Sequence, residues 1–319
     1  AFGNASQGRG GEAARRFAVK SGDEIVVSKA EHHSVLLPFQ ELAARTGATL
    51  KWFDLDDEGR ILANTADEVI TERTKIVAVT HVGNTTGAIT DIAPIVKRAH
   101  EVGAVVVLDA CQSVPHLKID LHALDVDFAA WSAHKMYGPT GVGFLYGKRE
   151  MLEALPPANF GGSMVELAWM DQEAQYMAPP ARFEAGTQPV AQVVAAGVAA
   201  EWLMNIGMEN LEAHERVIAG ELLKMGQIEG VRILGPHANE RRIGTVAFEI
   251  EGVHPHDVGQ FIDAQGIAIR VGHHCAQPVH RHFGVYASNR ASSGIYNCVE
   301  DAQALVEALK KVRPFFGVK

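Results

Sequence analysis

Between residues 20 and 147, short apolar runs alternate with segments whose apolar residues recur at helical spacing. Runs as apolar as EIVVS need cover on both faces, because a half-exposed strand would alternate apolar and polar residues. A mainly parallel sheet with helices on each side meets this need, so the sequence predicts an α/β fold with ligands at the strands' carboxyl ends. The runs expected to be strands are EIVVS, TLKWF, KIVAVTHV, AVVVLDA, DFAAWS and GVGFLYG.

The second half of the chain has a different pattern. An irregular stretch rich in proline and glycine, 156–188, precedes two helical patterns, Val190–Ile206 and Glu209–Ile228. Shorter strand patterns and a last helix, Val299–Val312, then predict a small α+β unit. We therefore expect a large α/β domain over 1–188, with the helix 190–206 as a candidate to complete it, and a smaller C-terminal α+β domain over 207–319.

Net charge and hydropathy limit the kinds of partner that the protein can bind. The net charge of −9 argues against nucleic-acid or anionic-membrane binding, because no basic excess is present to neutralise phosphates. No apolar run approaches the roughly 20 residues that span a bilayer, and no basic-then-apolar leader opens the chain. Three scattered cysteines form no disulfide framework. We therefore expect a cytoplasmic protein that binds small molecules or other proteins.

Polar side chains follow directly after four of the expected strands. A loop or capping role explains any one of them alone, but the same position after successive parallel strands places them at one edge of the sheet. The sequence therefore predicts a single site at that edge. Its candidate residues are His32, His81, Asn84, Asp109, Gln112, Ser132, His134 and Lys135.

Lys135 stands between the apolar run DFAAWS and the glycine-rich run GVGFLYG. An ammonium there loses hydration, which lowers its pKa and frees the neutral amine to form a Schiff base. Asp109 supplies the carboxylate that a pyridinium nitrogen needs as its partner, and Ser132 and His134 are suited to bind a phosphate. Lysine and aspartate at neighbouring strand ends suggest pyridoxal phosphate as the cofactor.

A second group of reactive residues lies in RVGHHCAQP, residues 270–278, and just beyond it. Three interpretations are open: a transition-metal site, a buried structural thiol, and a reactive Cys275 thiolate. The spacing of common zinc sites is missing, so no metal is expected. Neighbouring imidazoles and Arg270 would favour the thiolate, which is the interpretation we prefer. The metal interpretation would use His273, His274, Cys275, His280 and His282.

Several motifs along the chain resemble those of one family. They are SAHKMYGPTGVG, LDACQS, EHH, THVGN, RFEAGT, RVGHHCAQP and RASSGIYN. With them the chain is similar to group II, SufS/CsdA-type cysteine desulfurases of the class V aminotransferase superfamily, and the resemblance covers nearly the whole chain. It implies a pyridoxal-phosphate-dependent transferase of fold type I, with a mainly parallel seven-stranded sheet flanked by helices.

The resemblance also implies how the cofactor is held. Lys135 would bond to it and move the substrate's α-proton, and His32 would stack on its ring. Asp109 would pair with the ring nitrogen and Gln112 with the ring hydroxyl. Thr187 would reach the phosphate of a second subunit, which implies a homodimer. The phosphate of the same subunit would be bound by Ser132 and His134.

For the substrate, the resemblance implies L-cysteine, converted to L-alanine. Arg290, helped by Asn84, would hold the substrate carboxylate, and Arg270 would line the pocket. Cys275 would attack the substrate sulfur and keep it as a persulfide. A sulfur-acceptor protein of the SufE/SufU type would then collect that sulfur for iron–sulfur cluster assembly.

Three departures from the family pattern stand out. Ala133 replaces the glycine of SGHK, and Val35 stands where the family has asparagine in EHHAN. The family also has a segment before this chain's start, with a threonine-bearing loop that binds the cofactor phosphate. Two alternatives therefore stay open: a selenocysteine lyase, which shares fold and cofactor, and an inactive scaffold or truncated fragment of the same fold.

Overall fold

The structure, a computed structural model, describes residues 1–318. Its larger sheet has the strand order β2-β1-β3-β4-β5-β6. All neighbours are parallel except β5 and β6, which pair antiparallel. The strands are β1 Glu24–Ser28, β2 Thr49–Phe53, β3 Thr74–Thr80, β4 Val105–Asp109, β5 Phe128–Ser132 and β6 Gly143–Gly147.

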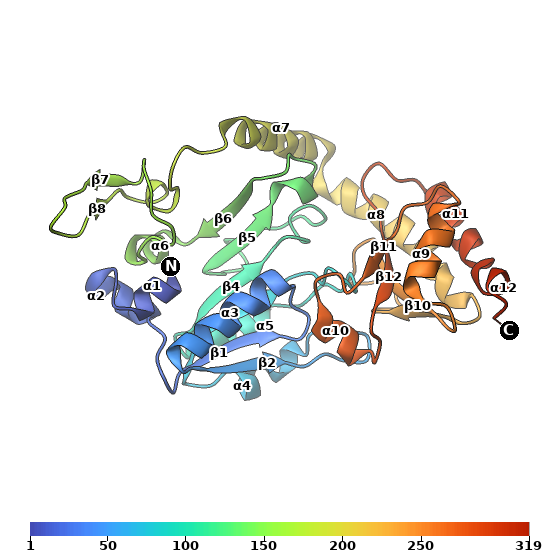
Figure 1. Cartoon of the computed structure of the whole chain (residues 1–319), viewed down its shortest axis with the longest axis horizontal. Helices are drawn as coiled ribbons and strands as arrows, with labels where there is room; N and C mark the ends of the chain where they lie inside the picture. The colour runs from blue at the N-terminus through green and yellow to red at the C-terminus, as the bar shows by residue number, and fades with distance from the viewer. Residues whose placement is uncertain (319) are drawn as a thin grey trace.

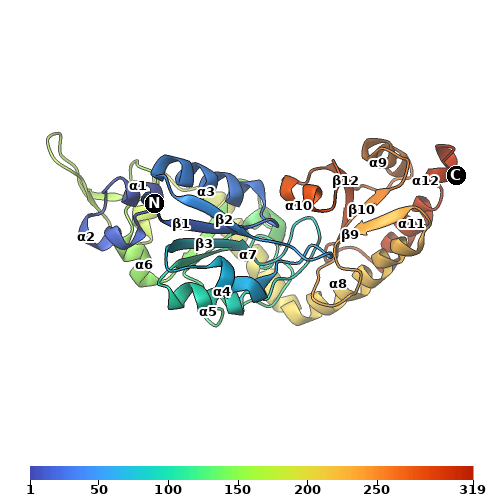
Figure 2. The same ribbon diagram turned by 90° about the horizontal axis from the view of Figure 1, so that it is seen from below.

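Helices cover both faces of this sheet, as the apolar strands require. Figure 2 shows α3 on one face and α4 and α5 on the other. Every residue of β1 is buried, whereas the edge strand β2 is largely half-exposed. The helices are α3 His33–Thr46, α4 Ala66–Val69, α5 Ala93–Glu101 and α6 Arg149–Ala154, with short 3-10 turns η2 Ala63–Thr65 and η3 Ala133–Met136.

The sheet has six strands within residues 1–318, not the seven that the family resemblance implied. The six strands coincide with the six apolar runs in the sequence. The segment before β1 contains no further apolar run and forms helices instead, which pack through Phe17 against Phe128 of β5. These elements are α1 Phe2–Ser6, α2 Gly11–Ala14 and η1 Arg15–Phe17.

A long helix links the two halves of the molecule. Figure 1 shows α7 passing over β5 and β6, and α8 running from its end toward the C-terminal lobe. Gly207, with φ 89°, separates the two helices. The observed bounds, α7 Val190–Ile206 and α8 Met208–Leu223, follow the predicted patterns closely, although η5 Lys224–Gln227 ends the second one. The preceding stretch holds only β7 Val165–Leu167, β8 Gln175–Tyr176 and η4 Ala181–Phe183.

No single helix within residues 1–318 is long and apolar enough to cross a membrane. Only the pair Val190–Ile206 and Met208–Gln227, bent by 78°, passes such a test jointly, by length and composition.

The C-terminal lobe is built on a four-stranded antiparallel sheet, ordered β11-β12-β10-β9. Its own buried cluster includes Phe248, while Val279 and Phe283 pack into the cluster of the large sheet. The predicted last helix stops at Leu309, before a separate short helix. The elements are β9 Val231–Leu234, β10 Thr245–Ile250, α9 Pro255–Asp263, β11 Arg270–Gly272, α10 Gln277–His282, β12 Ser288–Ser292, α11 Val299–Leu309 and α12 Val312–Phe315.

We propose the division 1–188 and 207–319 as the domain boundary, with α7 attached to the larger part. The second sheet and its cluster of buried side chains support it.

Candidate active site

The carboxyl ends of β1, β3, β4 and β5 meet at one edge of the large sheet. Thr80 at the end of β3 lies in register with Asp109 at the end of β4. The next residue, His81, donates its backbone N–H to the Asp109 carbonyl at 3.0 Å. Because these strands are parallel, the polar residues that follow them share one edge, as predicted.

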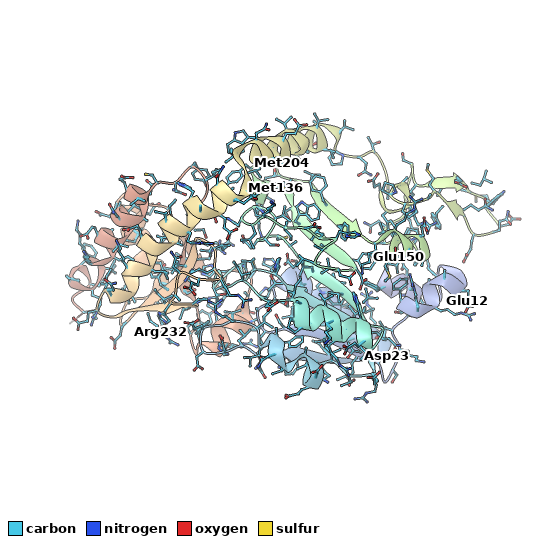
Figure 3. The ribbon with its side chains drawn as sticks, turned by 180° about the vertical axis from the view of Figure 1, so that it is seen from behind. Glu12, Asp23, Met136, Glu150, Met204 and Arg232 are labelled. Carbon is cyan, nitrogen blue, oxygen red and sulfur yellow. The ribbon has the colours of Figure 1, made fainter. Side chains whose placement is uncertain are left out.

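The turn that carries Lys135 is fixed by its neighbours. Lys135 lies half-buried in η3, and the buried Met136 packs with Leu203 of α7. Figure 3 shows Met136 beneath α7, close to Met204. Ala133 is fully buried and its φ lies outside the left-handed region, so its methyl group fits where the family pattern has glycine.

Electrostatic effects connect His32, Lys135 and Asp109. Burial and the Lys135 cation lower the pKa of His32, while the Asp109 carboxylate opposes them. The pKa of the neighbouring Cys111 is raised to about 11, first by burial and then by Asp109. Cys111 is therefore a neutral thiol at pH 7.

Glu31 is a buried acid that the sequence analysis did not single out. Its side chain is fully buried behind His32; its Oε1 accepts hydrogen bonds from Thr80 N at 3.0 Å and from the Ser28 hydroxyl. Burial raises its pKa to about 8, these hydrogen bonds oppose the shift, and Asp109 adds to it. Asp109 is therefore flanked by a carboxylic acid that is largely neutral at pH 7. An acid three residues after the end of an apolar strand was the available signal.

The Cys275 loop comes from the C-terminal lobe and docks on the large sheet. His33, in the first turn of α3, donates its backbone N–H to the Cys275 carbonyl at 2.8 Å. The Asn84 side-chain amide donates to the His274 carbonyl at 2.7 Å. The free N–H groups at a helix start need acceptors, so α3 holds the loop next to His32. Cys275 itself is half-buried.

Two arginines lie opposite each other beside this loop. Arg270 of β11 and Arg290 of β12 are register partners, and Arg290 Nη1 donates to the Asn84 carbonyl at 2.9 Å. Burial and then Arg270 lower the pKa of Arg290 to about 10, with Cys275 opposing, so the guanidinium stays charged at pH 7. Its buried Nε has no hydrogen-bond partner within residues 1–318. A carboxylate would satisfy such a donor.

We expected neighbouring imidazoles to favour the Cys275 thiolate, but His274 supplies no positive charge for this. Burial first, and then the Arg290 cation, lower the pKa of His274 to about 3, so the ring is neutral at pH 7. A buried imidazole without an acidic partner favours its neutral form. The fixed positive charges near Cys275 are therefore Arg290 and Arg270.

Three of the imidazoles that a metal site would need make hydrogen bonds to other protein groups instead. His274 and His280 each lie within hydrogen-bond distance of the Ser288 hydroxyl. His282 Nε2 lies 2.8 Å from the Asp56 carbonyl. In the part of the chain that the structure describes, no three His, Cys, Asp or Glu side chains could hold a metal ion.

The remaining predicted residues lie around the edge of the site. Gln112 and Ser132 are half-buried, His134 is exposed, and the Ser132 hydroxyl lies 4.0 Å from Cys111 Sγ. Thr187 lies in the exposed loop between η4 and α7, and Val35 lies half-buried in the first turn of α3. Cys298 is exposed at the start of α11.

Comparisons with known proteins agree with this arrangement. The family model "Aminotransferase class-V" matches residues 12–305. The chain is 49% identical over 297 residues to a probable cysteine desulfurase 2 of Mycobacterium leprae, covering 93% of this chain and 70% of that protein. It is 47% identical over 302 residues to a probable cysteine desulfurase of Streptomyces coelicolor, covering 94% and 72%.

Solved structures give the same result. The crystal structure of the cysteine desulfurase CsdA (S-sulfonic acid) from Escherichia coli matches with a TM-score of 0.90 and 35% identity, covering 98% of this chain and 77% of that one. The apo structure of a cysteine desulfurase from Thermococcus onnurineus matches with a TM-score of 0.89 and 33% identity, covering 98% and 78%. The chain therefore belongs to the class-V aminotransferase family, among its cysteine desulfurases.

Proposed function

We propose that this chain converts L-cysteine to L-alanine and keeps the sulfur as a persulfide on Cys275. The docking of the Cys275 loop on the start of α3 carries this proposal, because it brings a half-buried thiol next to His32. His32 in turn lies within electrostatic reach of both Lys135 and Asp109. A nucleophile, an amine and a carboxylate thus share one edge of the sheet.

The residues at this edge fit pyridoxal phosphate. Lys135 offers an amine for covalent attachment, Asp109 a carboxylate for the ring nitrogen, and His32 a flat, uncharged ring for stacking. When bound, this cofactor supplies an electron sink next to the substrate's α-carbon. Ser132, His134 and Gln112 surround this group and would bind its phosphate and hydroxyl oxygens; Thr187 would bind the phosphate of a second subunit.

Substrate recognition rests on the arginine pair. Arg290 presents a buried Nε–H without a partner, and a guanidinium fork matches a carboxylate through two parallel hydrogen bonds. Asn84 supports it indirectly, since its carbonyl accepts from Arg290 and its amide holds the Cys275 loop. Arg270 adds a second positive charge at the same place.

In this proposal Lys135 moves the substrate's α-proton, and Cys275 takes the sulfur. The Cys275 thiolate forms a new S–S bond with the substrate sulfur while the substrate's C–S bond breaks. The electron pair of that bond stays on carbon, which gains a proton and becomes the methyl group of alanine. Arg290 lies within electrostatic reach of both Cys275 and Arg270.

We also propose a homodimer. Four exposed apolar residues recur every fourth position along α7 and form a stripe on its outer face, which a helix facing only water would not carry. Thr187 lies in the exposed loop just before this helix, where it can reach a second copy. The stripe consists of Val190, Val194, Val198 and Trp202.

The persulfide sulfur would pass to an acceptor protein of the SufE/SufU type and from there to iron–sulfur cluster assembly. The three cysteines are all free thiols, which suits a reducing compartment such as the cytoplasm.

Mass spectrometry after addition of L-cysteine tests the function. The holoprotein should gain one sulfur on the Cys275 peptide, and borohydride reduction should mark Lys135. Cys275→Ser should bind the cofactor yet release no alanine, whereas Cys111→Ser and Cys298→Ser should remain active. Sulfur on either of the other cysteines would overturn the assignment. A competition between cysteine and selenocysteine separates this activity from that of a selenocysteine lyase.

A further inference from the structure

Three buried polar side chains lie behind the Cys275 loop and take no part in the chemistry described above. They are His274, His280 and Ser288, exposed by 3%, 1% and 0%. The Ser288 hydroxyl lies between the two rings, 3.0 Å from His274 Nε2 and 2.9 Å from His280 Nε2. His280 Nδ1 lies 3.1 Å from the Ala276 carbonyl, one helical turn back.

The positions of the protons in this series of hydrogen bonds can be worked out from the carbonyl group at one end of it. Two backbone groups face the His280 ring, Ala276 and Gly272, but within residues 1–318 only the Ala276 carbonyl lies at hydrogen-bond distance from it. Because a carbonyl oxygen only accepts, we place the His280 proton on Nδ1. Burial lowers the pKa of His280, which leaves Nε2 as a lone pair. The Ser288 hydroxyl then donates to that lone pair. The Ser288 oxygen in turn accepts from His274, whose proton must be on Nε2.

With the protons in these positions, His274 Nδ1 carries no proton and can only accept a hydrogen bond. Nδ1 is buried and has no hydrogen-bond partner within residues 1–318. A proton there would place a second cation beside Arg290, whose charge already disfavours the imidazolium. Burial and the Arg290 cation therefore keep His274 neutral, and the hydrogen bond to Ser288 selects the nitrogen that carries its proton.

The same hydrogen bonds hold an unusual backbone. His274 and Cys275 are consecutive residues in the left-handed region, with φ of 50° and 57°. Each costs about 1 kcal/mol or more for a residue other than glycine, so the surroundings must impose the conformation. His33 and Asn84 hold the two carbonyls, while Ser288 holds the His274 ring.

We propose that His280, Ser288 and His274 form a buried relay that positions the nucleophile. The relay fixes His274 in its Nε2–H form and holds the left-handed turn that presents Cys275. It rests on the proposed function only in taking Cys275 as the nucleophile. His280 and Ser288 touch neither substrate nor cofactor in this assignment and are positioning residues.

Nitrogen NMR of the full-length holoprotein labelled with 15N-histidine tests the proton positions directly. Two-bond spectra distinguish the neutral tautomers and the imidazolium. The expected result is opposite tautomers, Nδ1–H for His280 and Nε2–H for His274, both uncharged from pH 6 to 8. A charged ring, or a proton on His280 Nε2 where the Gly272 backbone faces the ring, would overturn the relay. This measurement needs no turnover, so a failure of the proposed activity leaves it readable.

Ser288→Ala tests positioning, with Ser113→Ala as the matched control. Ser113 is equally buried, and its hydroxyl donates to Ala110 in the large domain, 3.2 Å away. In Ser288→Ala, we expect His274 to lose its single tautomer and iodoacetamide to alkylate Cys275 several-fold faster. We also expect kcat for cysteine to fall several-fold with KM nearly unchanged, because Arg290 stays in place. An unchanged His274 tautomer and alkylation rate, or the same changes in Ser113→Ala, would refute the relay.

Discussion

Replacing Glu31 with glutamine should make the protein more stable at pH 8 than the native sequence. This is unusual, because replacing a buried ionisable residue normally lowers the free energy of unfolding. Glu31 is fully buried, and burial raises its pKa from 4.5 to about 8. Its Oε1 accepts from Thr80 and Ser28, while its buried Oε2 has no partner within residues 1–318. Glutamine keeps the accepting oxygen and resembles the protonated acid in shape and charge.

The size of the effect follows from the two pKa values. Between pH 5 and pH 8 the folded state keeps the Glu31 proton, whereas the unfolded chain, with a pKa near 4.5, has released most of it. The folded state binds more protons, so the free energy of unfolding falls as pH rises. At about 1.4 kcal/mol per pKa unit, the native protein loses about 3 kcal/mol over this range. Glu31→Gln keeps this part of the unfolding free energy, because glutamine does not release a proton.

Urea unfolding at pH 5, 6.5 and 8 measures the difference in unfolding free energy between the variant and the native protein. Other titrating groups cancel in this difference, so its slope with pH reports Glu31 alone. We expect the difference to increase by about 3 kcal/mol in favour of glutamine from pH 5 to pH 8. A difference independent of pH would show that Glu31 titrates near its ordinary pKa and would refute the reasoning.

Glu24→Gln is the matched control, at the other end of β1. Glu24 is also buried, but the Thr71 hydroxyl and the Lys51 and Arg73 cations outweigh burial and lower its pKa. Its contribution to stability is therefore complete at pH 5 and above. Glu24→Gln should destabilise the protein by a similar amount at all three pH values, unlike Glu31→Gln.

Three further predictions concern the proposed site. Asp109→Asn should lower kcat about 100-fold, since an amide does not hold a ring nitrogen protonated and about 3 kcal/mol of charge interaction is lost; near-normal turnover would contradict its role. Arg290→Lys should raise KM for cysteine about tenfold, the effect of one lost charge-assisted hydrogen bond; unchanged saturation would transfer the role to Arg270. Asn84→Ala should free the Cys275 loop, which faster hydrogen exchange of the His33 amide would report, and equal exchange would exclude this anchor.

The polar residues at the carboxyl ends of the large sheet's strands were predictable, because their places depend only on the residues next to them in the sequence. Apolar runs mark the strands, and parallel pairing aligns their ends. Asp109 is the last residue of β4, and Lys135 lies three residues after the end of β5. The bounds of α7 were also predictable, since its long apolar pattern has a glycine at its end. These features need no knowledge of distant contacts.

The surroundings of Cys275 depend on distant contacts. The hydrogen bond from Gln277 to His33 joins residues 244 positions apart, and no local pattern indicates such a contact. Sequence reasoning therefore could not show that the His274 ring is buried, and burial keeps this ring neutral. The protonated Glu31 was missed for the same reason, because its environment is created by β3 and Asp109 together.

Helix α7 is a single layer with different neighbours on its two sides. Leu203 on the inner side packs on Met136, the residue after Lys135, while Val198 and Trp202 lie on the outer stripe. A change in what covers the stripe therefore reaches the lysine turn by a short route, because the Trp202 ring packs edge-on against Tyr137, two residues after Lys135, with ring centroids 5.7 Å apart. Diluting the protein until subunits separate should then loosen cofactor retention at Lys135, so that the visible absorbance of the holoprotein depends on protein concentration.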